Sequence, residues 1–459
     1  MFQIMNSDEF RRIGYQVIDW IGDYMDSGYD GPVSPDTAPG ELLSLLPEGP
    51  PQKGEPGELL MEDFQRLILP RMTHWNDPRF FGYFPCNHSG PGILGDLLSA
   101  GLGVNAMSWA TSPAATELEV RMLEWLGQMI GLDWPGCIQD TASTATLCAL
   151  LAARERLDPI NQEGAYGKRP FVCYTSDQAH SSVLKAVRIA GLGGRFLRLI
   201  PSDSEFAMRP QALQQAIQQD RQDGLRPGFV TATVGTTSST GIDPVSRMAS
   251  ICRQYGLWLH VDAAMAGSAA ILPEMGWLME GVDQADSYLF NPHKWLFTNF
   301  DCTAFFCREP SHLKQALAIQ PEYLKTKHDA AAENFRDWSL QLGRRFRALK
   351  LWFVLRCYGV EGLQEKLRQH LKMARWMADQ LKACPQTSLI VEPRLNTVCF
   401  RLDSDERSEA LLQSINQSGQ AFLTHTRLNG RYAIRVSFGQ THSQMKHAED
   451  LWSLIEERV

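Results

Sequence analysis

Apolar and polar positions follow two spacings along the middle of the chain. From about residue 86 to 355, short apolar runs typical of buried strands alternate with stretches in which apolar residues recur every three or four positions, as in helices. The candidate strands occupy residues 171–175, 196–200, 229–234, 257–262, 287–290 and 304–307. Strands that alternate with helices are typical of a mostly parallel sheet, so residues 86–355 are predicted to form a large α/β domain.

The pattern before this domain is helical but has no core of its own. Apolar residues at positions 10, 13, 17, 21 and 24 follow helical spacing, and Asn6 or Ser7 can cap the start of the helix. A proline-rich stretch over 32–56 and a second helix over about 58–69, ended by Pro70, come next. We therefore predict that residues 1–85 form a helical arm that packs on a partner subunit, with packing on its own chain as the alternative.

A third pattern begins where the large domain ends. A helix is predicted to stop near Gly359, and leucines at 363, 367 and 371 mark another long helix. From about residue 389 apolar and polar residues alternate, for example over 434–438, which is typical of antiparallel strands. Residues 356–459 are therefore predicted to form a small C-terminal α+β domain.

Charge and cysteine content narrow the class of protein. The net charge of −8, with no basic stripe, argues against a nucleic-acid partner. Ten cysteines without framework spacing are typical of thiols in a reducing cytosol, so we expect a cytoplasmic protein. The first residues lack the basic region of a secretory signal, and no apolar run is long enough to span a bilayer, so no membrane association is expected.

Residues 287–295 contain the first candidate for chemistry. An apolar run ends at Pro292, and Lys294 follows between His293 and Trp295. A lysine beside an indole at a strand end is partly desolvated, which lowers its pKa and leaves more free amine to attack a carbonyl. The alternative is that Lys294 only extends its ammonium group into solvent from the end of a strand.

A second candidate lies 32 residues upstream of Lys294. The strand over 257–262 ends in Asp262, and small residues follow it at the edge where parallel sheets bind ligands. An aspartate there commonly caps the next helix. Together with the lysine, however, it has the chemistry that pyridoxal phosphate needs, because an aspartate holds the ring nitrogen protonated and a lysine holds the aldehyde.

These two stretches also carry a family resemblance. Asn-Pro-His-Lys-Trp at 291–295, Asn-Phe-Asp-Cys at 299–302 and His-Val-Asp-Ala-Ala at 260–264 resemble the group II pyridoxal-phosphate decarboxylases. Within that group the chain is most similar to the aromatic-L-amino-acid decarboxylases, over nearly its whole length. The resemblance implies a fold type I, PLP-dependent transferase-like architecture, bound pyridoxal 5'-phosphate, and an obligate homodimer with interlocked N-terminal segments and the active site at the subunit interface.

The resemblance also assigns residues to the cofactor. The hydroxyl-rich loop over 139–146 opens a helix, where backbone N–H groups can bind an anion, and the family places the cofactor phosphate at Ala142 and Ser143. His180 is expected to stack on the pyridine ring and face the substrate, with Ala264 on the opposite face. The other expected cofactor contacts are Thr236, Asp262, Asn291, His293 and Lys294.

The substrate pocket is expected to be aromatic. The residues that match the family's side-chain pocket are Trp75, Tyr83, Phe84 and Pro85, with Cys86 where the animal enzymes commonly carry threonine. Asn105 and Met107 match positions that the partner subunit contributes, and His180 completes the set. Such a lining favours a flat apolar ring, so tryptophan, phenylalanine, tyrosine or a hydroxylated relative is the expected substrate.

The last expected participant is a tyrosine on a lid. Residues 326–334 are polar with little to bury, as in mobile active-site lids, and Tyr323 precedes them at the position of the family's catalytic loop tyrosine. The implied mechanism is decarboxylation with Lys294 and Asp262 on the cofactor, followed by proton donation to Cα from Tyr323.

Three other functions compete with simple decarboxylation. An aldehyde synthase decarboxylates and then oxidatively deaminates, but that outcome accompanies loss of the lid tyrosine or the stacking histidine in related enzymes, and Tyr323 and His180 are present. An aminotransferase on the same fold and an inactive scaffold are the others. No metal site is expected, because the histidines and cysteines lack ligand spacing.

Overall fold

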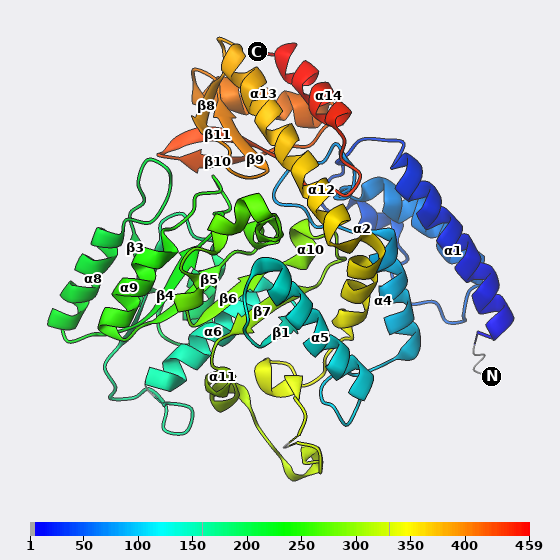
Figure 1. Ribbon diagram of the computed structural model, residues 1–459. Coiled ribbons are helices and arrows are strands. Elements are labelled where there is room, and N and C mark those ends of the chain that lie inside the picture. Colours follow the sequence, from blue (N-terminus) through cyan, green and yellow to red (C-terminus); the bar gives the residue numbers. More distant parts are fainter. Residues whose placement is uncertain (1–4, 158, 330) are drawn as a thin grey trace.

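The computed structural model describes residues 5–157, 159–329 and 331–459, and a seven-stranded sheet forms the centre of the large unit (Figure 1). Its strand order is β1-β7-β6-β5-β4-β2-β3. The strands are β1 (Gly136–Gln139), β2 (Phe171–Ser176), β3 (Leu197–Ile200), β4 (Arg226–Thr233), β5 (Trp258–Asp262), β6 (Ser287–Phe290) and β7 (Thr303–Cys307). All neighbours pair in parallel except β7, which is antiparallel to β6 and β1. The predicted mostly parallel sheet is confirmed, and β1 is a strand that the sequence did not predict.

Helices cover both faces of this sheet. Alternate residues of each strand point into two apolar clusters, for example Phe229 into one and Val230 into the other. One face is covered by α6 (Ala142–Leu157), α7 (Ser182–Ile189) and α11 (Pro310–Leu317). The other is covered by α5 (Pro113–Ile130), α8 (Pro210–Gln222), α9 (Val245–Tyr255) and the first half of α12 (Arg347–Ala383). Burial on both faces explains why these strands are continuous apolar runs.

The C-terminal part is a four-stranded antiparallel sheet with helices on it. The order is β10 (Thr424–Leu428), β11 (Arg431–Ser437), β9 (Thr397–Arg401) and β8 (Ser388–Val391). The last turns of α12 from Met373 onwards, α13 (Asp405–Gln417) and α14 (Met445–Glu456) share a separate apolar cluster with it. Gly359 interrupts α12 with φ +63°, near the helix end that the sequence predicts, and the chain then continues as a helix to Ala383. The domain bounds at 85 and 355 stay predictions.

The arm begins with α1 (Ser7–Ser27), whose N-terminus is capped by the Asn6 side chain. It continues through α2 (Glu41–Leu45) and α3 (Gly57–Asp63), which runs on as a π-helical turn over 64–68 and a 3₁₀ turn over 69–71. Within its own chain α1 packs through Trp20, whose ring meets Phe64 edge-on at 5.0 Å. Phe10 and Tyr15 on the same helix are largely exposed, which leaves an apolar strip of α1 uncovered in the single chain.

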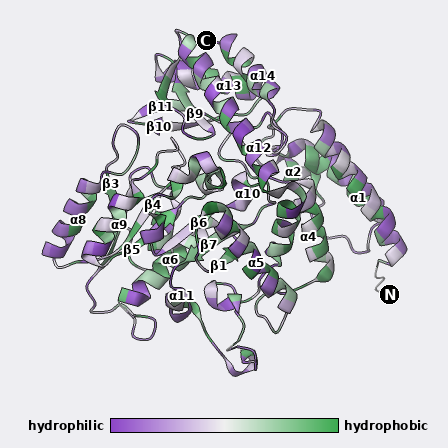
Figure 2. Ribbon diagram, in the orientation of Figure 1, coloured by the Kyte–Doolittle hydropathy of each residue, from purple (hydrophilic) through white to green (hydrophobic). Residues whose placement is uncertain are grey.

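The helix α4 (Gly90–Leu102) lies between the arm and α12 and is hydrophobic along most of its length (Figure 2). One side packs on α12, where Gly95 lies against the backbone of Lys350. The opposite side presents leucines that are about half exposed, at positions 94, 97, 98 and 102. No helix among the described residues combines the length and the apolar character that crossing a bilayer requires.

Three of the buried imidazoles have strongly lowered pKa values. They are His260 in β5, His293 after β6 and His370 in α12, and burial lowers the pKa of each to about 3. The unfolded chain would bind protons at these sites below a pH of about 6.5, whereas the folded chain would not. The folded state therefore loses free energy relative to the unfolded state as pH falls, by up to about 1.4 kcal/mol per pH unit for each imidazole.

We accordingly expect the free energy of unfolding to decline between pH 6.5 and pH 5, measured by urea unfolding at fixed protein and cofactor concentration. His370→Gln should make this decline shallower, and the exposed His425→Gln should leave it unchanged. A decline that starts only below about pH 4.5 would mean that carboxylates, and not these imidazoles, set the acid limit.

Candidate active site

The ends of two neighbouring strands bring Asp262 and Lys294 together. β5 and β6 run in parallel, with Asp262 in register with Leu289, so both strands end at the same edge of the sheet. The backbone N–H of Asn291 donates to the carbonyl of Ala264 (2.9 Å), which ties the two exits to each other. Lys294 follows in the short helix α10 (Pro292–Trp295). Burial lowers the pKa of the Lys294 amine, and the negative charge of Asp262 partly opposes that shift.

Asp262 is 5 % exposed and has one oxygen committed to the backbone. Its Oδ1 accepts from the N–H of Ala264 (3.0 Å), which leaves Oδ2 for another donor. Thr233, its register partner on β4, presents a buried hydroxyl that has no partner among the described residues. A buried carboxylate with a spare oxygen, beside a partly desolvated amine, matches the ring N–H and the aldehyde of pyridoxal phosphate. The donor set therefore fits that cofactor.

His180 lies in the loop after β2, close enough to interact electrostatically with both groups. Its Nδ1 accepts from the backbone N–H of Ser182 (3.2 Å) and pairs with the Ser182 hydroxyl (2.9 Å). Nδ1 acts as an acceptor, so the neutral ring carries its proton on Nε2. Burial, followed by the charge of Lys294, lowers the pKa of His180, while Asp262 acts in the opposite direction. A neutral imidazole with Nε2–H available is thus the form present near neutral pH.

The predicted phosphate cradle is the first turn of α6. Ala142 and Ser143 are its first two residues, and the backbone N–H groups of a first helical turn have no intrahelical acceptor. Thr303 Oγ1 donates to the carbonyl of Asp140 (3.2 Å) and to Asn291 Oδ1 (3.0 Å). Through Thr303, β7 therefore joins the loop before α6 to the residues that precede Lys294.

Two further predicted cofactor residues hold neighbouring backbone in place. His293 Nδ1 accepts from the N–H of Cys302 (2.9 Å), which fixes the turn after Lys294 against β7. Thr236 Oγ1 accepts from the N–H of Gly241 (2.8 Å) and so closes the loop that follows β4. Ala264 comes two residues after Asp262, in the same exit loop.

An aromatic wall stands beside Lys294. The ring of Trp75 stacks on Tyr83 at 5.3 Å with an interplanar angle of 11°, and it also meets Phe80 at 4.7 Å. The next aromatic residue, Phe84, has its ring centroid 5.4 Å from Lys294 Nζ. Pro85 follows Phe84, and Cys86 is close enough to Lys294 for its thiol and the amine to affect each other's charge. The predicted wall and the amine are therefore neighbours.

Arg435 is a site residue that the sequence reasoning missed. Its guanidinium carbon lies 5.3 Å from the centroid of Phe84, the same ring that Lys294 approaches. The side chain is 3 % exposed and donates to the Ser238 carbonyl (3.1 Å) and Thr424 Oγ1 (3.2 Å), but Nη2 is buried without a partner among the described residues. The available signal was a lone arginine in the otherwise apolar run 434–436.

Three predicted residues are not brought to this centre by their own chain. Tyr323 lies in a 3₁₀ turn over Glu322–Leu324 and is 78 % exposed. Asn105 Oδ1 accepts from the backbone N–H of Arg344 (3.0 Å). The Met107 carbonyl accepts from the backbone N–H of Arg336 (2.9 Å). The roles assigned to Tyr323, Asn105 and Met107 remain predictions.

The site and fold agree with the comparison to known protein families. The pyridoxal-dependent decarboxylase conserved domain matches residues 39–403, so the chain belongs to the pyridoxal-dependent decarboxylase family. It is an enzyme of the carboxy-lyase class, its cofactor is pyridoxal phosphate, and its fold is that of the fold type I enzymes. The predicted group II decarboxylase resemblance is thereby confirmed.

Two relatives and one solved structure show how similar the chain is to individual members of this family. The chain is 43% identical to the aromatic-L-amino-acid decarboxylase of Bos taurus, over 99% of this chain and 96% of that protein. It is 40% identical to the phenylacetaldehyde synthase of Arabidopsis thaliana, over 99% and 96%. The crystal structure of Oryza sativa TDC with PLP and tryptamine superposes with a TM-score of 0.97 at 36% identity, covering 100% of this chain and 99% of that one.

Proposed function

We propose that this enzyme decarboxylates an aromatic L-amino acid to the corresponding amine and carbon dioxide. The observation that carries the proposal is the aromatic wall, because the rings of Trp75 and Tyr83 stack and the next residue, Phe84, has its ring beside the Lys294 amine. A flat ring of the substrate would stack on this wall while its amino group faces Lys294. The similarity to aromatic-L-amino-acid decarboxylases, and to Catharanthus roseus tryptophan decarboxylase solved with L-tryptophan, supports the same substrate class.

Each protein group has a defined task in this reaction. When bound, pyridoxal phosphate supplies the ring that takes up the electron pair of the broken Cα–carboxylate bond. Lys294 would hold its aldehyde, Asp262 its ring N–H, and the first turn of α6 its phosphate. Asn291, His293 and Thr236 hold the loops on which these groups stand. Arg435, with a buried and unpartnered Nη2, would orient the substrate carboxylate.

Proton delivery to Cα is the step assigned to Tyr323. Its present exposure means that it can reach a site only by movement of the segment 321–334 or by insertion into a neighbouring subunit. The Nε2–H of His180 would face the substrate from the other direction and exclude water. With both residues present, protonation at carbon competes well against reaction with oxygen, which supports amine as the main product over aldehyde.

Replacing Tyr323 with phenylalanine tests that competition. We expect the rate of amine formation to fall by roughly 10²-fold or more, since a positioned proton donor contributes about 10²–10⁴. Part of the product should change from amine to aldehyde, with ammonia and hydrogen peroxide released as oxygen is consumed. Tyr166→Phe, at a fully exposed tyrosine, is the matched control. Unchanged amine formation without peroxide in Tyr323→Phe would remove Tyr323 from the mechanism.

A substrate panel tests the function itself. Tryptophan, phenylalanine, tyrosine and hydroxylated relatives should release carbon dioxide and the matching amine in equal amounts, and aspartate and glutamate should not. Peroxide and ammonia in stoichiometric yield from the unaltered enzyme would favour the aldehyde synthase. Amino transfer to 2-oxoglutarate without carbon dioxide would favour an aminotransferase.

We also propose that the enzyme works as a homodimer with its active site at the subunit interface. The half-exposed leucines of α4 and the exposed Phe10 and Tyr15 of α1 support it, because apolar side chains gathered on a surface often mark a protein–protein interface. A dimer would also supply Asn105, Met107 and Tyr323 from the neighbouring chain.

We further propose a cytoplasmic location. All ten cysteines are free thiols, which supports a reducing compartment.

Leu98→Glu on α4 tests the dimer. A charge buried at a dimer interface is costly, so the dissociation constant should rise by at least about tenfold, with loss of activity at low protein concentration. Analytical ultracentrifugation across a dilution series measures it. The control is Ile189→Glu, a somewhat more exposed apolar residue at the end of α7. A dimer of unchanged affinity in Leu98→Glu would exclude this face of α4 from the interface.

A further inference from the structure

His74 is held on two sides by residues at the end of α1 and in the segment after it. It is only 2 % exposed. Its Nδ1 lies 2.8 Å from the hydroxyl of Tyr24 on α1, and its ring stacks on Tyr29 at 4.1 Å with an interplanar angle of 17°. Its backbone N–H donates to the carbonyl of Val33 (2.9 Å). Tyr24, Tyr29 and Val33, at the end of α1 and just after it, therefore hold this imidazole by one hydrogen bond, one ring stack and one backbone bond. We call these three residues and His74 the clamp.

The protonation states of Tyr24 and His74 decide which of the two donates the hydrogen bond between them. Burial raises the pKa of Tyr24 to about 12, so the phenol keeps its proton. Burial also lowers the pKa of His74, so its ring is neutral near pH 7. The hydroxyl of Tyr24 then donates to Nδ1, and Nε2, which is buried without a partner among the described residues, carries the ring proton. No second hydrogen bond on this ring compensates for loss of the first.

The residue after His74 is Trp75 of the aromatic wall. The turn around it is made of short-range bonds, from the Trp75 N–H to the Thr73 carbonyl (3.0 Å) and from the Asp77 N–H to the His74 carbonyl (3.0 Å). Such a turn fixes its own shape but not its direction relative to the large unit. His74 ties this turn to the end of α1 and the segment after it through Tyr24, Tyr29 and Val33. The turn has further contacts, from the Thr73 hydroxyl to Ser34 (3.4 Å) and from the Trp75 ring to Phe80 (4.7 Å). Tyr24 and Tyr29 also line a polar cavity of about 850 Å³.

We propose that His74 is a positioning residue through which α1 and the segment that follows it orient the aromatic wall and so select substrates by ring size. This inference rests on the proposed function. Contacts of α1 reach Tyr24, whose ring also stacks on Trp20 (5.3 Å), pass through the hydrogen bond to His74, and fix the plane of Trp75 against Tyr83. A large ring such as indole uses the whole wall, whereas a phenyl ring uses less of it.

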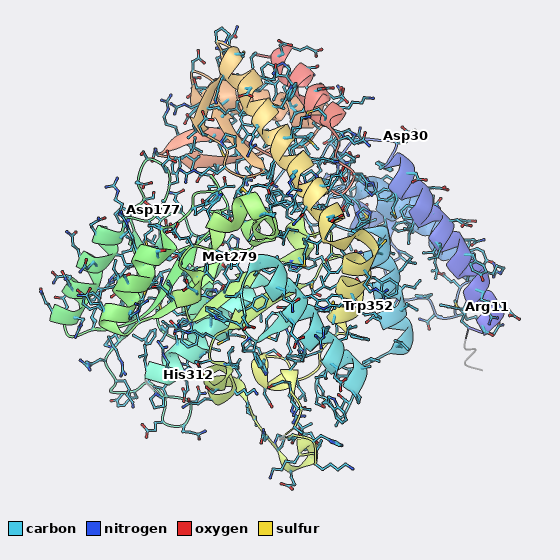
Figure 3. The ribbon with its side chains drawn as sticks, viewed as in Figure 1. Arg11, Asp30, Asp177, Met279, His312 and Trp352 are labelled. Carbon is cyan, nitrogen blue, oxygen red and sulfur yellow. The ribbon has the colours of Figure 1, made fainter. Side chains whose placement is uncertain are left out.

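The first test is kinetic. Tyr24→Phe keeps the ring and removes the hydroxyl, and His74→Gln removes the stack. A net hydrogen bond changes an equilibrium constant by roughly two- to tenfold, so we expect KM for tryptophan to rise by about that factor in Tyr24→Phe. The KM for phenylalanine should rise less, and kcat should stay within about twofold. The matched controls are Tyr166→Phe and His312→Gln, of which the second removes an imidazole on α11, far from α1 (Figure 3).

A double-mutant cycle then separates positioning from general loosening. If Tyr24 acts through Trp75, then Tyr24→Phe should change KM in the parent but not in a Trp75→Ala background. An equal effect in both backgrounds, or a loss of kcat and thermal stability at unchanged KM, would overturn the inference.

Hydrogen exchange gives a readout that needs no substrate. Amides over residues 72–84 should exchange faster in Tyr24→Phe and His74→Gln than in the two controls. If the parent enzyme decarboxylates no aromatic amino acid, the proposed function fails, and this exchange measurement still decides whether the clamp orders the wall. Unchanged exchange over 72–84 in both clamp variants would overturn it.

Discussion

Lys294→Ala is expected to lower the rate of decarboxylation by at least about 10³-fold. The reason is that Lys294 Nζ is the amine beside both Asp262 and Phe84, and its burial lowers its pKa so that the nucleophilic free amine is more available. Without it, the substrate amine must react with a cofactor that no protein nitrogen has prepared or positioned. The measurement is kcat with the best substrate of the panel, with Lys185→Ala, an exposed lysine on α7, as control.

Chemical labelling makes the same prediction independently of turnover. Borohydride reduction of the cofactor-loaded enzyme should leave a pyridoxyl group on the peptide that contains Lys294, and the label should be absent from Lys294→Ala. A small free amine added to that variant should restore part of the activity, because only the amine is missing. A pyridoxyl label on any other lysine would contradict the assignment.

Asp262→Asn is expected to have the second largest effect, a fall in kcat of roughly 10²–10⁴-fold. The substitution keeps the size of the side chain and, in its Oδ1 position, the bond from Ala264, but removes the negative charge. A neutral amide cannot hold a proton on the ring nitrogen, so the stabilisation of developing charge in the transition state is lost. Asp262→Ala should be at least as impaired.

The Asp262 variants need a control for charge and a control for cofactor loss. Asp283→Asn, at an exposed aspartate in the 3₁₀ turn Val282–Gln284, should leave kcat unchanged. Cofactor content should be measured in each preparation and kcat expressed per bound cofactor, so that weak binding is not mistaken for slow chemistry. Activity close to that of the parent in fully loaded Asp262→Asn would show that another group charges the ring.

The catalytic centre was predictable because its key residues end strongly apolar strands. Asp262 and Lys294 each follow a buried run, and parallel strands end at one edge, so two sequence positions 32 residues apart become neighbours. The covering helices and the antiparallel small sheet were predictable from their spacings for the same reason. The strand β1 was missed because Gly136 and Gln139 leave only two apolar residues between them, so the four residues do not form an apolar run.

Other parts of the site depend on tertiary contacts that a linear pattern does not encode. Arg435 fits the alternating pattern of a strand, and that pattern alone assigns it no role in the site. It belongs to the site because β11 places its guanidinium against the ring of Phe84. His74 carries no motif, and its importance arises because Tyr24 and Tyr29, some fifty residues earlier, close on it. Tyr323 was predicted through family resemblance alone, since local sequence describes only an exposed turn.

The long helix α12 has a mechanical consequence because it packs on both units. Its residues up to Leu371 pack on the unit that holds Lys294, and those from Met373 onwards pack on the unit whose strand β11 carries Arg435. The amine and the guanidinium therefore belong to different units, and both lie against the ring of Phe84. Because the helix runs from Glu361 to Ala383 without a second break, it crosses the boundary as one rigid rod and should keep the gap available to a substrate at a fixed width.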